Sequence, residues 1–469
     1  MRKTKIVCTI GPASENEETV RGLALAGMNV ARLNFSHNTH ADHQHRIDLV
    51  KKVRKELNLP IAIMLDTKGP EYRIKTFKNG KITLNDGDTF TFTTRDVEGD
   101  STIVSVSYDK LNKDLAVGDT ILLNNGLLIF KVEQIEDTEI ICKVITGGDL
   151  SDRKSMSFPG RVMKQEYLSQ QDKDDIAFGV KNGIDYIACS FVSTKQDLID
   201  VQTYLNEIGA EDIDLIAKIE NQSGVDNIEE ICEHCTGIMV ARGDMGVEIP
   251  FEMLPGIQKS LITKCRLLGK RVITATEMLE SMITNPRPTR AEISDVANAV
   301  YDGTSAIMLS GETAAGKYPV QAVQAMARIA ETAESNIDYT KRFHNSEFKI
   351  RNTMDAISHG TCSMAIDTNA KAIVACSLSG MTARMVSRFR PPVDIIGLTT
   401  DERTWRKLAM SWGIQPAICE MFTSTEVLFY TAKKIAERDL KLNSGDRIVI
   451  TGGATGESGA TNVIKVESI

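Results

Sequence analysis

The chain has 469 residues, too many for one ordinary hydrophobic core, and this length predicts about three domains. Apolar residues make up 42% of the chain, as in soluble globular proteins, and the net charge of −8 argues against a general nucleic-acid binder. No apolar run approaches the ~20 residues of a membrane span, and the start, MRKTKIVCTIGP, lacks the apolar length of a signal peptide. The nine cysteines are scattered through apolar runs, as buried thiols are in a reducing compartment, so we expect a cytoplasmic protein.

Short apolar, β-branched runs alternate with amphipathic stretches of helical period in two separated blocks of the chain. Such alternation predicts right-handed strand–helix–strand units and a parallel sheet. Eight strands close a (β/α)8, or TIM, barrel, so we expect this α/β fold for residues 1–69 and 168–343. The expected strands are Lys5–Thr9, Met28–Phe35, Ile61–Asp66, Tyr186–Phe191, Leu215–Glu220, Gly237–Arg242, Arg271–Thr276 and Ala306–Glu312.

Residues 70–167 interrupt this alternation with short strands of period two. Turns at Asn79-Gly80, Asp86-Gly87 and Asn125-Gly126 separate several of them, as hairpins require. We therefore predict an all-β insert in the form of a small barrel, hung after the third strand of the large barrel. Its two connections suit a lid that closes over the strand ends and excludes water. The expected strands are Tyr72–Phe77, Thr89–Thr93, Ile103–Val106, Thr120–Leu123, Leu127–Val132 and Glu139–Val144.

Residues 344–469 form a third predicted unit, which begins with a polar, linker-like segment. A helix over about Thr353–Asp367 and further strand–helix alternation predict an open α/β sheet. The expected strands are Ala372–Ser377, Asp394–Thr399, Ile414–Cys419, Arg447–Thr451 and Asn462–Val466.

Polar residues gather where the strands of the large barrel end. In a (β/α)8 barrel these ends build the active site, so the pattern favours catalysis. The residues are Arg32, Asn34, Ser36, Asp66, Lys68, Ser190, Lys218, Glu220, Asp244, Thr276, Ser310 and Glu312.

The stretch DLIAKIEN followed by GIMVARGDMG gives the most specific site hypothesis. Lys218 and Glu220 share one face of a strand because side chains alternate, and Asp244 follows the next strand. Two carboxylates suit a hard divalent cation such as Mg²⁺, and a neighbouring lysine can stabilise charge that develops on a substrate oxygen. The alternative is a strand end that carries a solvated salt bridge.

Arg32, Asn34 and Ser36 share a face of an earlier strand. A guanidinium can clamp a phosphate or carboxylate, and amide and hydroxyl oxygens can coordinate a monovalent cation, to which Asp66 and Thr67 would add ligands. The alternative is a capped strand end. The four nearby histidines lie in a polar loop and helix start, which does not favour a metal site; they are His37, His40, His43 and His45.

Ser377–Thr382 follows a strand and precedes a helix in the third unit. Hydroxyls and backbone amides at a helix N-terminus can bind an anion, and the glycine-rich loop Thr451–Thr461 could close over it. An ordinary capped helix is the alternative.

With these motifs in place, the chain resembles the pyruvate kinase family, of the bacterial type, over its full length. LDTKGPE, AKIEN and NPRPTRAE are the most specific matches. They lie within a larger set of matched segments: Arg32–His37, Leu65–Glu71, Lys218–Asn221, Arg242–Glu248, Thr274–Met278, Asn285–Arg290 and Ser310–Pro319. The resemblance implies a phosphotransferase that moves phosphoryl from phosphoenolpyruvate to ADP, giving pyruvate and ATP, in the last step of glycolysis.

The resemblance also implies roles for individual residues. Glu220 and Asp244 would hold Mg²⁺ (or Mn²⁺), while Lys218 would stabilise the transferring phosphoryl and the enolate. Catalytic residues would be Lys218, Arg32 and Thr276. Substrate would bind at Arg32, Ser190, Lys218, Gly243, Asp244 and Thr276. Nucleotide would bind at Asn34, His37, Arg73 and Lys154, and K⁺ at Asn34, Ser36, Asp66 and Thr67. A candidate effector phosphate site comprises Ser377, Ser379, Gly380 and Thr382.

Further expectations concern regulation and assembly. Glu71 matches the acidic residue of K⁺-dependent members, so we predict K⁺ activation. Met245 and Glu277 depart from the usual leucine and glutamine of the family. Leu378 and Met381 stand where members that respond to fructose-1,6-bisphosphate often carry a basic residue, so we expect a sugar monophosphate or AMP as the effector, with the absence of allostery as the alternative. A homotetramer is implied, with no nucleic-acid or membrane partner.

Two other functions stay open on the residues alone. Another Mg²⁺-dependent barrel enzyme that forms an enolate of pyruvate would explain Lys218, Glu220 and Asp244, but not the insert or LDTKGPE. A regulatory or scaffold protein that senses metabolites would not need the matched catalytic residues, all of which are present.

Overall fold

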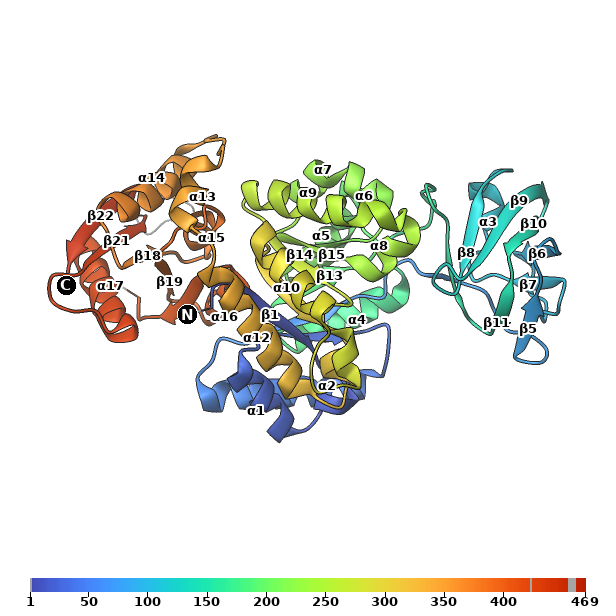
Figure 1. Ribbon diagram of the computed structural model, residues 1–469, viewed down its shortest axis with the longest axis horizontal. Coiled ribbons are helices and arrows are strands. Elements are labelled where there is room, and N and C mark those ends of the chain that lie inside the picture. The colour runs from blue at the N-terminus through green and yellow to red at the C-terminus, as the bar shows by residue number, and fades with distance from the viewer. Residues whose placement is uncertain (1, 422–423, 454–460) are drawn as a thin grey trace.

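The computed structural model describes residues 2–421, 424–453 and 461–469. Figure 1 shows three units in a row: the C-terminal domain, a central barrel and the β-rich insert. Among the described residues, no helix is long and apolar enough to cross a membrane.

Eight parallel strands close the central barrel, and this confirms the predicted fold class. The order around the barrel follows the chain, and β17 pairs with β1 to complete the ring. The strands are β1 (Lys5–Thr9), β2 (Val30–Asn34), β3 (Ala62–Asp66), β13 (Tyr186–Cys189), β14 (Asp214–Ile219), β15 (Gly237–Ala241), β16 (Arg271–Ala275) and β17 (Ala306–Leu309).

Helices surround this barrel, and their starts carry the sequence signals of capping. Thr39, Ser169 and Thr289 each cap a helix whose third residue is acidic and bonds back to the cap. The long helices are α1 (Glu17–Ala26), α2 (His40–Leu57), α4 (Gln170–Lys181), α5 (Lys195–Glu207), α9 (Leu254–Leu267), α10 (Arg290–Asp302) and α12 (Pro319–Ser335). The short helices are η1 (Pro12–Ser14), α6 (Gln222–Asp226), α7 (Ile228–Glu233), α8 (Arg242–Glu248), η2 (Phe251–Met253), η3 (Glu280–Ile283), α11 (Gly311–Ala314) and α13 (Tyr339–Asn345).

The side chains of each barrel strand alternate between two cores. Val7, Met64 and Ile216 belong to the core inside the barrel, whereas their neighbours along the strands pack against the helices. Met410, from the C-terminal domain, belongs to the inner core and is fully buried. The C-terminal domain therefore plugs the end of the barrel opposite to the strand C-termini.

The insert is a seven-stranded sheet with a separate two-stranded ribbon. The sheet order is β4-β12-β8-β9-β10-β6-β7, and an antiparallel bridge between Ile74 and Val106 joins its two edges, as in the small barrel that the sequence predicts. Phe90, Phe92 and Phe130 form its aromatic centre. The elements are β4 (Tyr72–Arg73), β5 (Lys81–Leu84), β6 (Thr89–Thr93), β7 (Ile103–Ser105), α3 (Leu111–Asp114), β8 (Thr120–Leu123), β9 (Leu128–Glu136), β10 (Glu139–Thr146), β11 (Gly148–Ser151) and β12 (Ser155–Ser157).

The C-terminal domain is the expected open α/β sheet, in the order β20-β19-β18-β21-β22. Only β22 is antiparallel to its neighbour among the paired strands of this sheet that the structure describes. The elements are α14 (Thr353–Asp367), β18 (Ala372–Cys376), α15 (Met381–Arg388), β19 (Asp394–Thr399), α16 (Glu402–Leu408), β20 (Ile414–Ile418), α17 (Thr425–Leu440), β21 (Arg447–Gly452) and β22 (Val463–Ser468).

Candidate active site

Lys218 lies at the centre of a buried polar cluster at the C-terminal end of β14. Its Nζ lies 3.0 Å from Asp66 Oδ1, 3.1 Å from Glu220 Oε1 and 2.6 Å from Ser190 Oγ. Burial alone would lower the pKa of Lys218, but the negative charges of Asp66 and Glu220 outweigh it and raise the pKa. The lysine is therefore held as a cation, and the structure brings together residues that the sequence placed on three different strands.

Arg32 joins the same cluster from β2. Its Nε lies 2.6 Å from Asp66 Oδ2, and its Nη1 donates to Thr9 Oγ1 at 2.9 Å. Burial would raise the pKa of Asp66, but Arg32 and Lys218 lower it. Asp66 is thus an anionic bridge that fixes two cations beside one another.

Glu220 presents an oxygen that the protein does not fully satisfy. Its Oε2 accepts the backbone amide of Phe191 at 2.6 Å, while Oε1 is buried and accepts no hydrogen bond from the described residues beyond its ion pair with Lys218. Burial, opposed by Lys218 and aided by Asp244, raises the pKa of Glu220 to about 7. Asp244 is exposed in the first turn of α8. A buried oxygen that accepts no described hydrogen bond beyond its ion pair with Lys218, together with an exposed carboxylate, fits a divalent cation that takes its other ligands from substrate and water.

The described residues contain no cluster of three or more His, Cys, Asp or Glu that could hold a metal by themselves.

Thr276 lies in a strained turn after β16. Thr276 has φ 75° and Glu277 has φ 55°, values that are costly for a β-branched or long side chain. Arg242 holds this turn: its Nη2 donates to the carbonyl oxygen of Thr276 at 2.6 Å, and its Nη1 lies 2.7 Å from Asp295 Oδ1. Gly243 approaches from the other side, and a Cβ there would lie 2.9 Å from Thr276 Cγ2. The backbone of 243–244 and the Thr276 side chain are therefore adjacent.

A cleft of about 340 Å³ lies between the insert and the mouth of the barrel. Its insert side includes Glu71 and Arg73, and its barrel side includes Phe191 and Asp244. Arg73 forms an ion pair with Glu71 and also donates to the carbonyl oxygen of Arg153 at 2.7 Å. Lys154 lies next to this contact in the chain but is not among the cleft residues.

The predicted K⁺ ligands lie at the ends of β2 and β3, but several already have partners. Asn34 Oδ1 accepts the backbone amide of Ser36 at 3.1 Å, and Ser36 is exposed. Thr67 is buried, and its Oγ1 accepts the backbone amide of Ser190 at 3.1 Å. Both carboxylate oxygens of Asp66 face cations. This K⁺ site stays a prediction.

The histidine-rich segment is built into the fold. His37 is exposed, and its carbonyl oxygen lies 3.0 Å from His43 Nε2. His43 stacks on Phe35 with 4.0 Å between ring centroids, and burial lowers its pKa to about 4. His40 Nε2 lies 2.6 Å from Asp175 Oδ1. These contacts explain His40 and His43 as packing and pairing groups, whereas His37 takes part in them only through its carbonyl oxygen.

The candidate effector segment does connect β18 to α15. Gly380 has φ 77°, which favours glycine, and Ser377 Oγ accepts the backbone amide of Thr382 at 3.4 Å. Thr382 Oγ1 lies 2.6 Å from Thr461 Oγ1, while Ser379 is exposed. Most of the glycine-rich loop expected to cover this segment, residues 454–460, lies outside the described residues.

Three residues that hold the site in place have no role that the sequence predicts. They are Arg242, which grips the Thr276 turn; Phe191, whose amide binds Glu220; and Tyr167, whose hydroxyl donates to the Ser190 carbonyl oxygen at 2.6 Å. Only Arg242 carried a signal, because it directly follows a strand. Glu312, a predicted strand-end acid, instead binds the backbone amides of Leu279 and Ser310 at 3.0 and 2.7 Å.

Comparison with known proteins gives consistent matches over the whole chain. Residues 1–323 match the family model described as "Pyruvate kinase, barrel domain", and residues 355–467 match "Pyruvate kinase, alpha/beta domain". The chain is 48% identical to a pyruvate kinase of Clostridium acetobutylicum, with 100% of both chains covered. It is 48% identical to one of Staphylococcus epidermidis, over 100% of this chain and 81% of the relative. A crystal structure of a pyruvate kinase from Cryptosporidium parvum superimposes with a TM-score of 0.95 at 39% identity, over 100% of this chain and 96% of the other.

Proposed function

The chain belongs to the pyruvate kinase family and is a phosphotransferase that moves phosphoryl from phosphoenolpyruvate to ADP; from this premise we propose how its own residues divide the work. The observation that carries the proposal is the position of Lys218, which lies within 3.1 Å of both Asp66 and Glu220. In the reaction the P–O bond of phosphoenolpyruvate breaks, its electron pair stays on the enolate oxygen, and a new P–O bond forms to the β-phosphate of ADP. Such a transfer depends mainly on alignment and on neutralisation of charge.

Lys218 is the main cation that the protein supplies for this step. Asp66 and Ser190 fix its Nζ, so the ammonium need not reorganise as charge shifts from the enol oxygen to the phosphoryl group. Arg32, fixed by the same Asp66, would bind the phosphate of the substrate. Lys218 and Arg32 would together place two positive charges beside the phosphoryl group as it leaves phosphoenolpyruvate.

Members of this family generally need a divalent cation and K⁺. Glu220 and Asp244 would hold Mg²⁺ or Mn²⁺, and the buried Oε1 of Glu220, whose one described partner is Lys218, supports this assignment. When bound, this cation supplies positive charge that screens the phosphoryl oxygens. The chain keeps Glu220 in place through the amide of Phe191.

The carboxylate of phosphoenolpyruvate would lie against the turn that follows β15 and β16. The backbone amides of Gly243 and Asp244 and the hydroxyl of Thr276 are the donors that we assign to it. The close approach of Gly243 to Thr276 supports one shared pocket. After transfer, the enolate carbon needs a proton, and the candidate donor is Thr276 or a water chain near Ser310 and Glu312.

The nucleotide and K⁺ assignments rest on the resemblance. Arg73, Lys154, Asn34 and His37 would contact ADP, with Arg73 lining the cleft beside the barrel mouth. K⁺ would be held at the ends of β2 and β3, by Asn34, Ser36, Asp66 and Thr67. Glu71 supports a K⁺ requirement.

Regulation and assembly are proposed on the same basis. A sugar monophosphate or AMP would bind at Ser377, Ser379, Gly380 and Thr382, and the protein would act as a cytoplasmic homotetramer.

A coupled assay of pyruvate formation, with and without Mg²⁺ and K⁺, tests the proposal. In Lys218→Met we expect kcat to fall about 10³-fold or more because a preorganised cation is lost. Binding of Mn²⁺, followed by electron paramagnetic resonance, should persist in this variant. Turnover near the wild-type level in Lys218→Met would refute the assigned role.

A further inference from the structure

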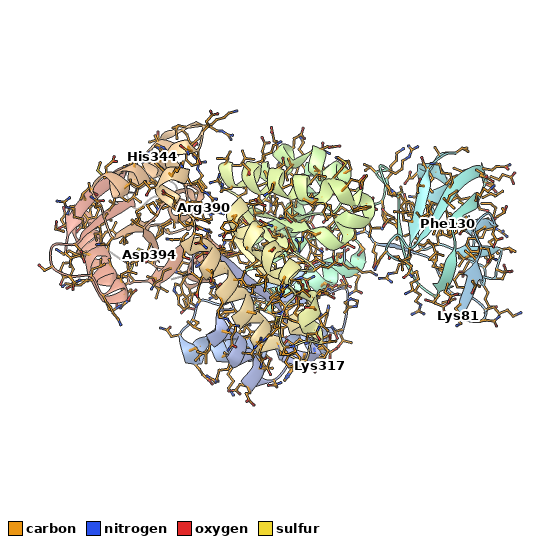
Figure 2. All side chains as sticks on the ribbon, viewed as in Figure 1. Lys81, Phe130, Lys317, His344, Arg390 and Asp394 are labelled. Atoms are coloured by element: carbon orange, nitrogen blue, oxygen red, sulfur yellow. The ribbon has the colours of Figure 1, made fainter. Side chains whose placement is uncertain are left out.

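A second polar cavity lies at the opposite end of the barrel, where the C-terminal domain joins it. Its barrel wall comes from the end of α9, the start of β16 and Ser305, and its other wall comes from α15 and the residues that follow α16. Figure 2 shows Arg390 at this junction between the two domains. A volume of about 10 Å³ gives room for one water-sized group.

The walls of this cavity are strongly cationic. Six positively charged side chains line it, and no Asp or Glu does so among the described residues: Arg266, Lys270, Arg271, Arg384, Arg388 and Arg390. Two of the six have carboxylate partners outside the cavity, since Arg271 pairs with Asp214 at 2.8 Å and Arg388 with Asp355 at 2.9 Å.

The other four cations form no ion pair with a carboxylate of the described residues, although Asp214 acts on Arg384 and Glu334 acts on Arg390 over a longer distance. Lys270 donates to the carbonyl oxygen of Cys235 at 2.8 Å. Arg266, Arg384 and Arg390 form no ion pair with any carboxylate of residues 2–421, 424–453 and 461–469. An unpaired guanidinium is costly to bury because it loses the hydration that stabilises its charge.

Unused hydrogen-bond donors concentrate at the same place. Arg266 Nε and Nη1, and the Nε atoms of Arg384, Arg388 and Arg390, are buried without an acceptor in the described part of the chain. Arg266 is 8% exposed and Arg390 is 3% exposed. Burial, reinforced by the neighbouring Arg266, lowers the pKa of Arg390 well below its ordinary value. Buried donors are rarely left unpaired in stable proteins, so a missing acceptor is indicated.

We propose that this cavity binds one small inorganic anion, held by Arg266, Arg384 and Arg390 between the barrel and the C-terminal domain. An anion supplies both features that the walls lack: negative charge and a hydrogen-bond acceptor. A halide ion fills the one water-sized space, whereas a phosphate satisfies the need by placing one of its oxygens there.

Arg390 is organised in advance for such a ligand. Its Nη1 donates to the Ser387 carbonyl oxygen at 2.8 Å, and its Nη2 donates to Ser305 Oγ at 3.0 Å. Its guanidinium lies 4.7 Å from the ring centroid of Trp412. Because these contacts with both domains fix the plane of the Arg390 guanidinium, its Nε is the donor that remains for the anion. The bound anion would therefore tie the two domains together.

Thermal unfolding of the full chain tests binding. The unfolding midpoint is followed while phosphate or bromide replaces a bulky organic anion at constant ionic strength. Arg266→Gln removes one charge that makes no described hydrogen bond, and Arg328→Gln, at an exposed helix position, is the matched control. We expect both anions to raise the midpoint of the wild type and of Arg328→Gln. In Arg266→Gln the apparent affinity should weaken about tenfold because a charge-assisted contact is lost.

In the anion-poor buffer, the expected effect of Arg266→Gln on the unfolding temperature has the opposite sign. There, Arg266→Gln should unfold at a higher temperature than the wild type, because an unneutralised buried charge is gone. Phosphate that binds only at the active site would stabilise all three proteins equally, and that result would overturn the proposal.

Bromide also locates the site. Crystals of the full chain soaked in bromide should show an anomalous peak between Arg266 and Arg390, which weakens in Arg266→Gln. If phosphate but not bromide protects the wild type, the natural ligand is an oxyanion; if both protect, any small anion suffices. No peak in the cavity together with an unchanged midpoint in both anions would overturn the assignment.

Discussion

The Nη2 atom of Arg242 lies 2.6 Å from the carbonyl oxygen of Thr276, and this contact holds a strained turn beside the proposed carboxylate pocket. Lysine cannot reproduce the planar fork that binds this carbonyl and Asp295 together. In Arg242→Lys we expect the KM for phosphoenolpyruvate to rise and kcat/KM to fall about 100-fold, since small displacements in an aligned site are costly.

Steady-state kinetics in both substrates check this prediction. A positioning role requires the KM for ADP to stay near the wild-type value, whereas a general loss of structure would change both constants and the circular dichroism spectrum. An unchanged KM for phosphoenolpyruvate in Arg242→Lys would contradict the role.

Gly243 and Thr276 are coupled by contact. In Gly243→Ala the new Cβ would lie 2.9 Å from Thr276 Cγ2, too close for two carbon atoms, so the pocket must shift. We expect kcat/KM for phosphoenolpyruvate to fall about 100-fold. Thr276→Ser removes Cγ2 but keeps the hydroxyl, so the double variant should recover a large part of the loss.

Kinetics of the two single variants and the double variant form a double-mutant cycle. Additive effects in this cycle would show that the loss in Gly243→Ala does not come from its contact with Thr276.

The alternation of apolar runs with amphipathic helical stretches was enough to predict the barrel. The two-residue period of side chains along a strand placed Lys218 and Glu220 on one face. The strands of the insert were harder to predict, because β11 of the ribbon and β12 of the sheet are short and their register is set by partners distant in the chain. The left-handed backbone of Thr276 carried no sequence signal. The burial of Met410 inside the barrel could not be predicted for the same kind of reason, because nothing local distinguishes it from other apolar residues of its segment.

Substitution of Glu71 tests the proposed K⁺ requirement. Its carboxylate lines the cleft beside the barrel mouth and forms an ion pair with Arg73. In Glu71→Lys an ammonium would supply positive charge in place of K⁺, so we expect the ratio of kcat with K⁺ to kcat without K⁺ to fall towards one. Glu71→Gln removes the carboxylate without adding a cation and is the matched control, which should keep the K⁺ dependence. Assays with K⁺ replaced by a tetraalkylammonium ion decide the matter, and an equal K⁺ response in all three proteins would refute the assignment.

The burial of Lys5 predicts how the stability of the folded protein depends on pH. The lysine is buried at the end of the barrel that faces the C-terminal domain, and its Nζ donates to the Ile414 carbonyl oxygen at 2.6 Å. Burial, reinforced by Arg2 and only partly offset by Glu334, lowers its pKa from 10.5 to about 7. Lys3, which lowers the pKa, and Asp394, which raises it, also face this group.

The direction of this pH dependence follows from the number of protons that the folded and unfolded chains bind. Between pH 7 and 10.5 the unfolded chain binds a proton at Lys5 that the folded protein does not, so this residue's contribution to the free energy of unfolding rises with pH and is lost as the pH falls towards 7. From pH 7 to pH 9 the gain is at most about 2.7 kcal/mol. The unfolding midpoint of the wild type minus that of Lys5→Met should therefore increase over this range. The same substitution at Lys317, an exposed lysine, serves as the control (Figure 2). A difference between wild type and Lys5→Met that stays constant with pH would show that Lys5 keeps its charge in the folded protein.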